Sequence, residues 1–136
     1  MEPSPADERE TAYDLLQRGE DLLRRRHHAQ AAIVLERANR LEPHRQSILE
    51  ALGRAYFNSG QHELARRSFS ELLELEPSAH YAHYALGQSL KRLGRPSEAR
   101  THLKLAVALS PRTPLYRQAL ARLPSPKPEP EPDPDA

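Results

Sequence analysis

The sequence predicts an all-α fold, an α-solenoid of repeated helix pairs, and three observations lead to this prediction. First, several residue columns recur with a period of 34 residues, which is the mark of a repeat architecture. Second, apolar residues within each unit fall at helical spacing. Third, only 5% of the residues are aromatic, and Leu and Ala far outnumber Val and Ile, a composition that suits closely packed helices rather than strands. The recurring columns include Pro43, Pro77 and Pro111; Gly19, Gly53 and Gly87; and Ala31, Ala65 and Ala99.

The second unit shows the helical spacing most clearly. Leu49, Leu52, Tyr56 and Phe57 lie at i, i+3, i+7 and i+8, and a second apolar run follows after a short polar turn around Gly60. Each unit is therefore expected to be two antiparallel helices joined by a short turn.

The ends of the helices carry their own residue types. Gly60 and Gly94 lie where the chain leaves a first helix, a position that favours a left-handed backbone conformation. Arg26 occupies this place in the first unit, so we expect a looser turn there. Pro43 and Pro77 follow second helices, which proline ends because it lacks an N–H.

Glycine in the middle of a first helix calls for a packing reason, because it costs about 1 kcal/mol relative to alanine. We expect Gly19, Gly53 and Gly87 to contact Ala31, Ala65 and Ala99, respectively, on the partner helices.

The pattern Leu52-Gly53-x-x-Tyr56, Ala65, Phe69, Pro77 resembles the tetratricopeptide repeat, and the other two units follow it with a few departures. The resemblance covers residues 12–113 and implies a right-handed superhelix. It places the repeats at residues 12–45, 46–79 and 80–113.

The flanking segments differ from the repeats. Residues 114–123 are expected to form a capping helix whose apolar side, Leu115, Ala119, Leu120 and Leu123, covers the third repeat. Residues 1–11 are expected to be a disordered arm. Residues 124–136 have proline at every second position from 124 to 134, which predicts a disordered, extended acidic tail with a net charge of −3, against about +4 for the rest of the chain.

The resemblance also implies a concave groove lined by the first helices, in which a protein or peptide partner binds. Aromatic and Leu side chains would anchor the partner, and Arg54 and Lys91 would supply charge-assisted hydrogen bonds. The positions that the family turns inward are Tyr13, Leu16, Glu20, Leu23, Glu50, Arg54, Phe57, Asn58, Tyr81, Tyr84, Gln88 and Lys91.

One well-known ligand class of three-repeat proteins is disfavoured. Members that clamp the carboxylates of heat-shock chaperones use a Lys/Asn/Asn/Lys/Arg set, and none of the five is retained here. The corresponding residues are Leu16, Glu20, Ala51, Tyr81 and Ala85.

No catalytic site, metal site or cofactor is expected. The chain has no Cys and no phosphate-binding or metalloprotease motif, and His80 and His83, one helical turn apart, lack the third ligand that zinc requires. No apolar window is long enough for a membrane span, and residues 1–5 lack the features of a signal peptide, so we expect a cytoplasmic protein without a membrane partner.

The groove predicts a non-catalytic adaptor or scaffold that binds a peptide or helix of a partner, and two alternative functions and one regulatory hypothesis remain beside it. The chain could self-associate as a homodimer or larger structural assembly. The basic run Arg24 to Arg26 could mark an RNA-associated module, which interspersed acidic residues and missing aromatic platforms disfavour. The acidic tail could compete with a partner for the groove or the basic body.

Overall fold

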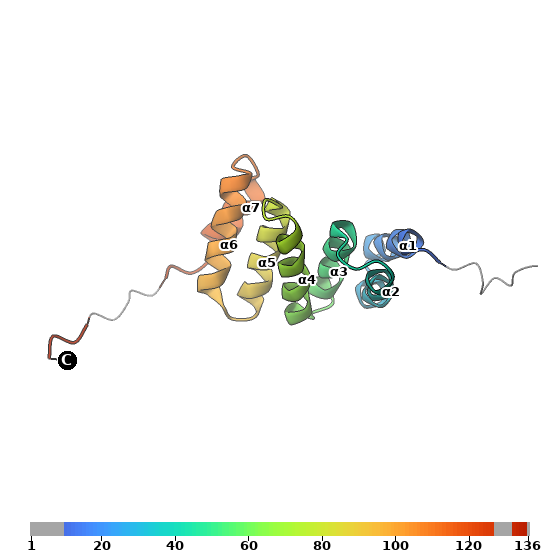
Figure 1. Cartoon of the computed structure of the whole chain (residues 1–136). Coiled ribbons are helices and arrows are strands. Elements are labelled where there is room, and N and C mark those ends of the chain that lie inside the picture. Colours follow the sequence, from blue (N-terminus) through green and yellow to red (C-terminus); the bar gives the residue numbers. More distant parts are fainter. Residues whose placement is uncertain (1–9, 127–131, 136) are drawn as a thin grey trace, which may run out of the picture.

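The computed structural model describes residues 10–126 and 132–135, and in this part the chain forms helices and no strands. Figure 1 shows the helices stacked side by side in one elongated row, from α1 at one end to α6 and α7 at the other. Their bounds are α1 Ala12–Arg24, α2 His28–Leu41, α3 Gln46–Asn58, α4 His62–Leu75, α5 His80–Arg92, α6 Pro96–Leu109 and α7 Pro114–Ala121. The all-α solenoid prediction is confirmed.

The helices pack as antiparallel pairs, α1 with α2, α3 with α4, and α5 with α6. Each second helix also contacts the first helix of the following pair, and the first helices contact one another directly, α1 with α3 and α3 with α5. One such junction includes a hydrogen bond of 2.7 Å, in which the hydroxyl of Tyr56 on α3 donates to Glu36 Oε1 on α2. The first helices therefore form one continuous layer.

The start of α1 corrects the expected extent of the N-terminal arm. Thr11 caps α1: its hydroxyl accepts from the backbone N–H of Asp14, whose carboxylate accepts in turn from the N–H of Thr11. Glu10 forms ion pairs with Arg18 and, at 3.6 Å, with Arg37 of α2. Glu10 and Thr11 thus belong to the folded part, and residues 1–9 of the expected arm lie outside the described residues.

The three turns between paired helices share one geometry. Gly60 and Gly94 have φ values of 82° and 74°, which confirms the left-handed conformation expected there. Arg26 has φ 62°, and the following N–H donates to the Leu22 carbonyl at 2.8 Å, as the N–H of Gln61 does to the Tyr56 carbonyl at 2.8 Å. The expectation of a looser first turn is therefore wrong: Arg26 adopts the conformation that glycine adopts more easily.

The mid-helix glycines face a large apolar side chain, and the expected alanine is among the nearest neighbours at Gly87 alone, where the Ala99 carbonyl oxygen would lie 3.2 Å from an added Cβ. A Cβ at Gly53 would lie 2.6 Å from the Phe69 ring, and one at Gly87 would lie 2.8 Å from Leu103 Cγ. A Cβ at Gly19 would meet Leu35 in the same way. The large apolar side chain of the second helix therefore fills most of the space left by each glycine, which corrects the expected contact for Gly19 and Gly53.

The capping helix α7 is shorter than expected, and the prediction for one residue of its buried side, Leu115, is wrong. It ends at Ala121 rather than 123, and Leu115 is 47% exposed, which corrects its place on the buried side. Tyr116 is buried in its stead, with 3% exposure, together with Ala119 and Leu123. The 116, 119, 123 spacing is itself helical, so the tyrosine ring defines the packing face.

The segment after α7 begins without regular secondary structure at residues 124–126, where the Pro124 carbonyl accepts from the Arg100 guanidinium. Residues 127–131 and 136 of the expected extended tail lie outside the described residues. Within the described part, none of the helices has the combination of length and apolar sequence that spanning a bilayer requires.

Candidate functional site

An open cavity of about 190 Å³ lies between the first helices α3 and α5. Six of the twelve residues expected in the groove line it, and the other lining residues are Phe69 and Ala85. The six are Arg54, Phe57, Asn58, Tyr81, Tyr84 and Gln88. The 34-residue register thus brings the predicted residues of the second and third pairs together in one place.

Aromatic rings form the wall of this cavity. Phe69 of α4, 1% exposed, forms its floor and packs edge-on against Tyr81, with ring centroids 6.3 Å apart. Tyr81 packs beside Tyr84 at 6.1 Å, and Tyr84 packs beside Tyr116 of α7 at 5.2 Å. The result is a row of rings from α4 across α5 to α7 that offers apolar contact to a bound side chain.

Polar groups mark the rim of the same cavity. The Gln88 amide donates to the Tyr84 hydroxyl at 3.3 Å, and Arg54 is exposed. Burial raises the pKa of Tyr81, an effect that the Arg54 charge partly offsets and the Glu50 charge reinforces. At neutral pH Tyr81 therefore remains protonated and can donate a hydrogen bond.

A second hollow extends the first toward the C-terminal ends of α3 and α5. Its lining residues are Phe57, Gln88, Lys91 and Arg92, so it shares Phe57 and Gln88 with the aromatic cavity. Lys91 and Arg92 are exposed. The aromatic cavity consequently borders a basic end, and we call the two hollows together the α3–α5 groove.

The first helix pair contributes fewer residues to the groove than the sequence predicts. Leu23 is only 7% exposed and belongs to the core cluster, so its expected place in the groove is wrong. Leu16 and Glu20 are half-buried and Tyr13 is 67% exposed, and all three lie outside both hollows. Glu50 of α3 is half-buried and lines neither hollow. Its negative charge nevertheless helps to raise the pKa of the Tyr81 and Tyr116 hydroxyls.

Four residues of this region were not among the predicted site residues, namely Phe69, Ala85, Arg92 and Tyr116. Phe69 recurs at the same register as Leu35 and Leu103, and the 34-residue period therefore predicts that it is buried. The period does not predict that its ring also lines the cavity. Arg92 directly follows Lys91 at the end of α5. Tyr116 could be found only by knowing which face of α7 packs inward.

The histidines considered for metal binding have other partners. His80 Nδ1 lies 2.7 Å from the Tyr116 hydroxyl. The Nε2–H of His83 donates to the Pro77 carbonyl at 2.8 Å, and its Nδ1 lies 3.1 Å from Nδ1 of His102. These contacts connect helices, and the described residues contain no group of three or more His, Asp or Glu side chains arranged around a common point.

Comparison with known proteins assigns the family. The sequence profile of the tetratricopeptide repeat matches residues 16–66 and 50–114, most of the helical region. The chain belongs to the tetratricopeptide repeat family. Repeats of this family generally mediate contacts between proteins and act as non-enzymatic scaffolds.

The relatives of this tetratricopeptide repeat protein differ in size and binding. Superkiller complex protein 3 of Mus musculus is 33% identical over 94 residues, which are 69% of this chain but only 6% of that protein. The first repeat domain of Spaghetti (RPAP3), bound to the HSP90 peptide SRMEEVD, superposes with a TM-score of 0.79 at 17% identity, covering 83% of this chain and 90% of that one. YrrB, described as having an unusual peptide-binding site, gives 0.78 at 22% identity, covering 82% and 57%.

Proposed function

We propose that this protein is a non-catalytic adaptor that binds a peptide or helix of another protein in the α3–α5 groove. The observation that carries the proposal is the open aromatic cavity, which gathers six groove positions of two neighbouring repeats at one place. A concave apolar site with a few polar groups at its rim is the usual form of a specific binding site.

The chemistry of the groove indicates what the peptide should offer. An apolar side chain would lie against Tyr81, Tyr84 and Phe57, where aromatic surfaces give most of the contact energy of peptide recognition. Arg54 and Lys91 carry fixed donors, which favour carbonyl or carboxylate acceptors beside that anchor. We therefore expect a segment with an apolar anchor flanked by acceptor groups.

This mode differs from clamping of a chaperone C-terminus. The positions at which the clamp would need donors hold Leu16 and the buried Ala51 and Ala85, and Glu20 would repel a carboxylate. The HSP90 peptide bound by the similar Spaghetti domain is thus a poor candidate ligand here, whereas a peptide site of another composition, as YrrB is described to have, suits this groove better.

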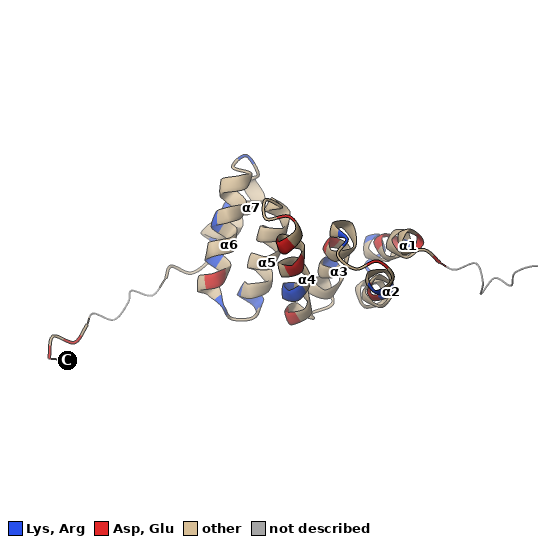
Figure 2. Ribbon diagram, viewed as in Figure 1, with Lys and Arg blue, Asp and Glu red and all other residues tan. Residues whose placement is uncertain are grey.

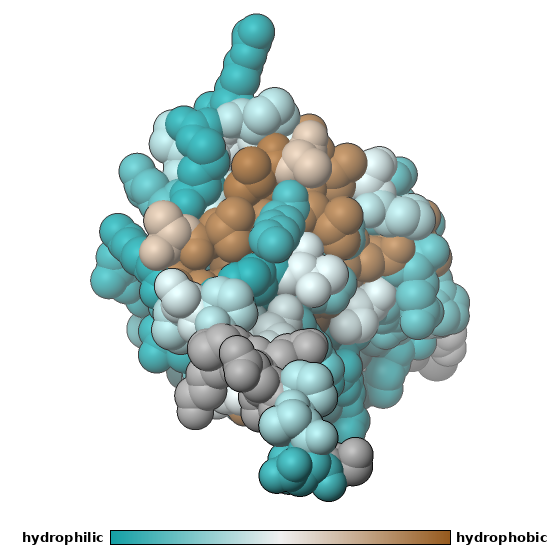
Figure 3. Space-filling model, turned by 90° about the vertical axis from the view of Figure 1, so that its left-hand side faces the viewer, coloured by the Kyte–Doolittle hydropathy of each residue, from teal (hydrophilic) through white to brown (hydrophobic). Residues whose placement is uncertain are grey.

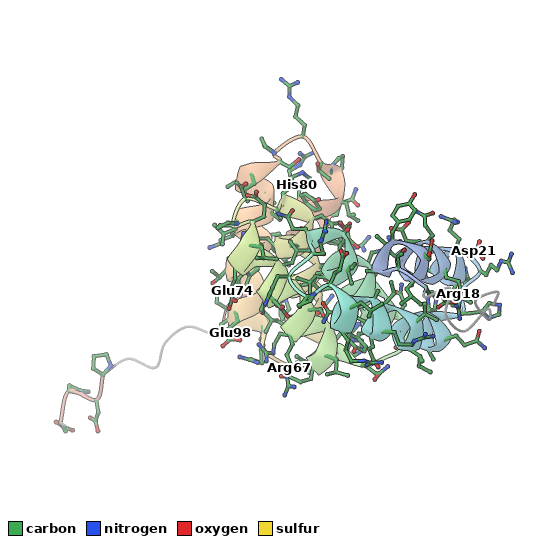
Figure 4. All side chains as sticks on the ribbon, turned by 45° about the vertical axis from the view of Figure 1, so that its right-hand side comes forward. Arg18, Asp21, Arg67, Glu74, His80 and Glu98 are labelled. Carbon is green, nitrogen blue, oxygen red and sulfur yellow. The ribbon has the colours of Figure 1, made fainter. Side chains whose placement is uncertain are left out.

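Site-specific photo-crosslinking tests the proposal. A photoreactive phenylalanine derivative at position 88, in the groove, should capture a partner from a lysate of the source cell, and the same residue at position 67 should not. Figure 4 shows Arg67 and Glu74 on α4, where both side chains are exposed to solvent and outside the groove. The crosslinked product, identified by mass spectrometry, names the partner.

A double variant, Arg54→Ala with Tyr84→Ala, provides the second arm. It should lose the crosslinked partner, whereas the matched pair Arg67→Ala with Glu74→Ala should keep it, once circular dichroism has shown both to be folded. Retention of the partner by the groove variant overturns the proposal. A crosslink only to a second copy of this chain, with a dimer in light scattering, would replace the adaptor function by self-assembly.

A further inference from the structure

The helix α7 takes the place of the first helix of a fourth pair, and no second helix follows it among the described residues. Its residues continue the 34-residue register: Leu120 matches Leu52 and Leu86, and Ala121 matches Gly53 and Gly87. In the second and third pairs, a Leu followed by a small residue packs against the second helix, and α7 has the same two residue types at these positions.

The complete pairs show what normally covers this register. Leu52 and Leu86 are 4% exposed, and the side chains of Phe69 and Leu103 fill the space above Gly53 and Gly87. In α7 Ala121 is exposed and Leu120 is only half-buried. The following residues cannot supply the missing cover as a helix, because proline occupies every second position from 124 to 134.

Basic side chains surround this uncovered register. Arg117 takes the place held by the buried Leu49 and His83, which face the second helices of their own pairs. On α6, Arg100 and Lys104 occupy the positions that Arg66 and Ser70 hold on α4. Arg66 and Ser70 line a hollow between α4 and the next second helix, α6, which contributes Glu98 and His102 to it. By the same register, Arg100 and Lys104 face the place where a further second helix would lie. We call the surface formed by Arg100, Lys104, Arg117, Leu120 and Ala121 the open end face.

The charge of this region is strongly one-sided. Residues 91–123 hold eight Lys and Arg residues against the single carboxylate of Glu98, a net charge of +7, and Glu98 already pairs with Arg95 at 2.7 Å. Within the described residues, none of the three basic side chains of the open end face forms an ion pair. Arg100 and Arg117 instead donate to the neutral backbone carbonyls of Pro124 and Pro111, so no carboxylate of the described part pairs with their charges. Figure 2 shows the basic positions along α6, and Figure 3, which views this end, shows apolar surface between hydrophilic side chains.

We propose that the open end face binds an acidic amphipathic helix of another protein, which takes the place of the missing second helix. An apolar side chain of that helix packs on Leu120 and Ala121, and its carboxylates pair with Arg100, Lys104 and Arg117. The site is separate from the α3–α5 groove, so the protein would hold two partner segments at once.

Other occupants fit this face less well. A second copy placed symmetrically would set the same three basic side chains against each other, which is repulsive. Single-stranded nucleic acid lacks a stacking platform, because Tyr116 is the sole Phe, Tyr or Trp between residues 93 and 123 and it is buried. Residues 124–136 carry carboxylates, but their sequence offers no apolar side chain larger than proline, and the alternating prolines disfavour a helix. In the described part of the chain, this segment contacts the face through the hydrogen bond from Arg100 to the Pro124 carbonyl, which involves no carboxylate.

The test uses the full chain and a designed peptide followed by fluorescence anisotropy. The probe has the 14-residue length and apolar positions of α4, with Leu in place of Phe69 and glutamate at the positions that face Arg100, Lys104 and Arg117. We expect saturable binding that Arg117→Glu weakens at least about tenfold and Ala121→Leu weakens similarly, because the larger side chain blocks close approach. Both residues are exposed, so the fold should be unaffected.

Matched controls separate the site from general charge. Arg24→Glu changes the net charge equally but lies at the far end of the molecule, so it should leave affinity within about twofold. A peptide with lysine at the three glutamate positions should fail to bind the wild type and should bind the triple variant Arg100→Glu, Lys104→Glu, Arg117→Glu. The groove variant Arg54→Ala with Tyr84→Ala should bind the probe normally, so failure of the groove proposal and of this one are distinguishable.

Four results would overturn the inference. Equal weakening by Arg24→Glu would show non-specific attraction, and equal binding of the lysine peptide would show that charge plays no part. Displacement of the probe by a 15-nucleotide oligouridine that needs the same three residues would assign the face to nucleic acid. Displacement by a synthetic peptide of residues 124–136 at a similar concentration would assign it to the tail.

Discussion

At the scale of single residues, Arg26 occupies a left-handed position that the two equivalent turns give to glycine. A non-glycine residue there is strained by about 1–2 kcal/mol, and glycine recovers this at the expense of a more flexible unfolded chain. We therefore expect Arg26→Gly to raise the free energy of unfolding by about 0.5–1 kcal/mol, measured by urea denaturation. The reverse changes, Gly60→Ala and Gly94→Ala, should lower it. A lower stability of Arg26→Gly would mean that the exposed arginine side chain makes a favourable contact that outweighs the strain.

At Gly53 the absence of a side chain matters, rather than the backbone freedom of glycine, because Phe69 packs directly against the helix there. Even a Cβ would lie 2.6 Å from the ring of Phe69, which is 1% exposed, so the ring or the helix would have to shift to admit any side chain. Gly53→Leu should therefore cost about 1–3 kcal/mol or more in thermal unfolding. The neighbouring change Arg54→Ala, at an exposed side chain, should cost little. Equal effects of the two changes would contradict the assigned packing.

At the scale of helices, α5 and α6 are joined by a histidine pair whose protonation should make stability depend on pH. His83 and His102 stack with centroids 5.3 Å apart. Burial lowers the pKa of His102, His83 lowers it further, and Glu98 opposes the shift; Arg66 and Arg95 also lie beside the ring. Since the folded protein resists this proton, stability should be unaffected above the ordinary pKa near 6.5. It should fall as pH drops below 6.5 and level off below the lowered pKa.

The measurement is the urea midpoint at pH 7.5, 6.5 and 5.5, where most carboxylates remain ionised. The chain has seven histidines, so the variant His102→Asn supplies the reference. The wild type should lose more stability than the variant between pH 7.5 and 5.5. An equal loss in both would assign the dependence to other histidines.

The period predicted the helices well and their inward faces less well. Apolar spacing and Pro or Gly boundaries act within a few residues of sequence, so they identified each helix pair and its turn. In α7, however, both 115, 119 and 116, 119, 123 are helical sets, and only contact with His80 and Tyr84 makes Tyr116 the buried member. Leu23 shares its register with Phe57 and Lys91, which line the groove, but its aliphatic side chain joins the core.

At the scale of the whole molecule, each helix pair in the row is stabilised mainly by its contacts with the neighbouring pairs. The candidate site depends on this arrangement, because its wall continues from α4 through α5 to Tyr116 of α7. The sequence could indicate which residues share the concave layer, but the position of the cavity between α3 and α5 depends on ring contacts across three helices. The end helix thus supports both the third pair and the binding surface.

The change Tyr116→Ala tests this dependence. It removes a buried ring and the contact with His80, so it should cost about 3–5 kcal/mol in unfolding free energy, the usual range for truncating a core aromatic residue. Amide hydrogen exchange should become much faster in α5, α6 and α7, moderately faster in α3 and α4, and nearly unchanged in α1 and α2, because each pair contacts only its neighbours. A uniform acceleration across all helices would instead mean that the chain unfolds as one cooperative unit. A mutation in α7 would then destabilise the α3–α5 groove and the open end face to the same extent.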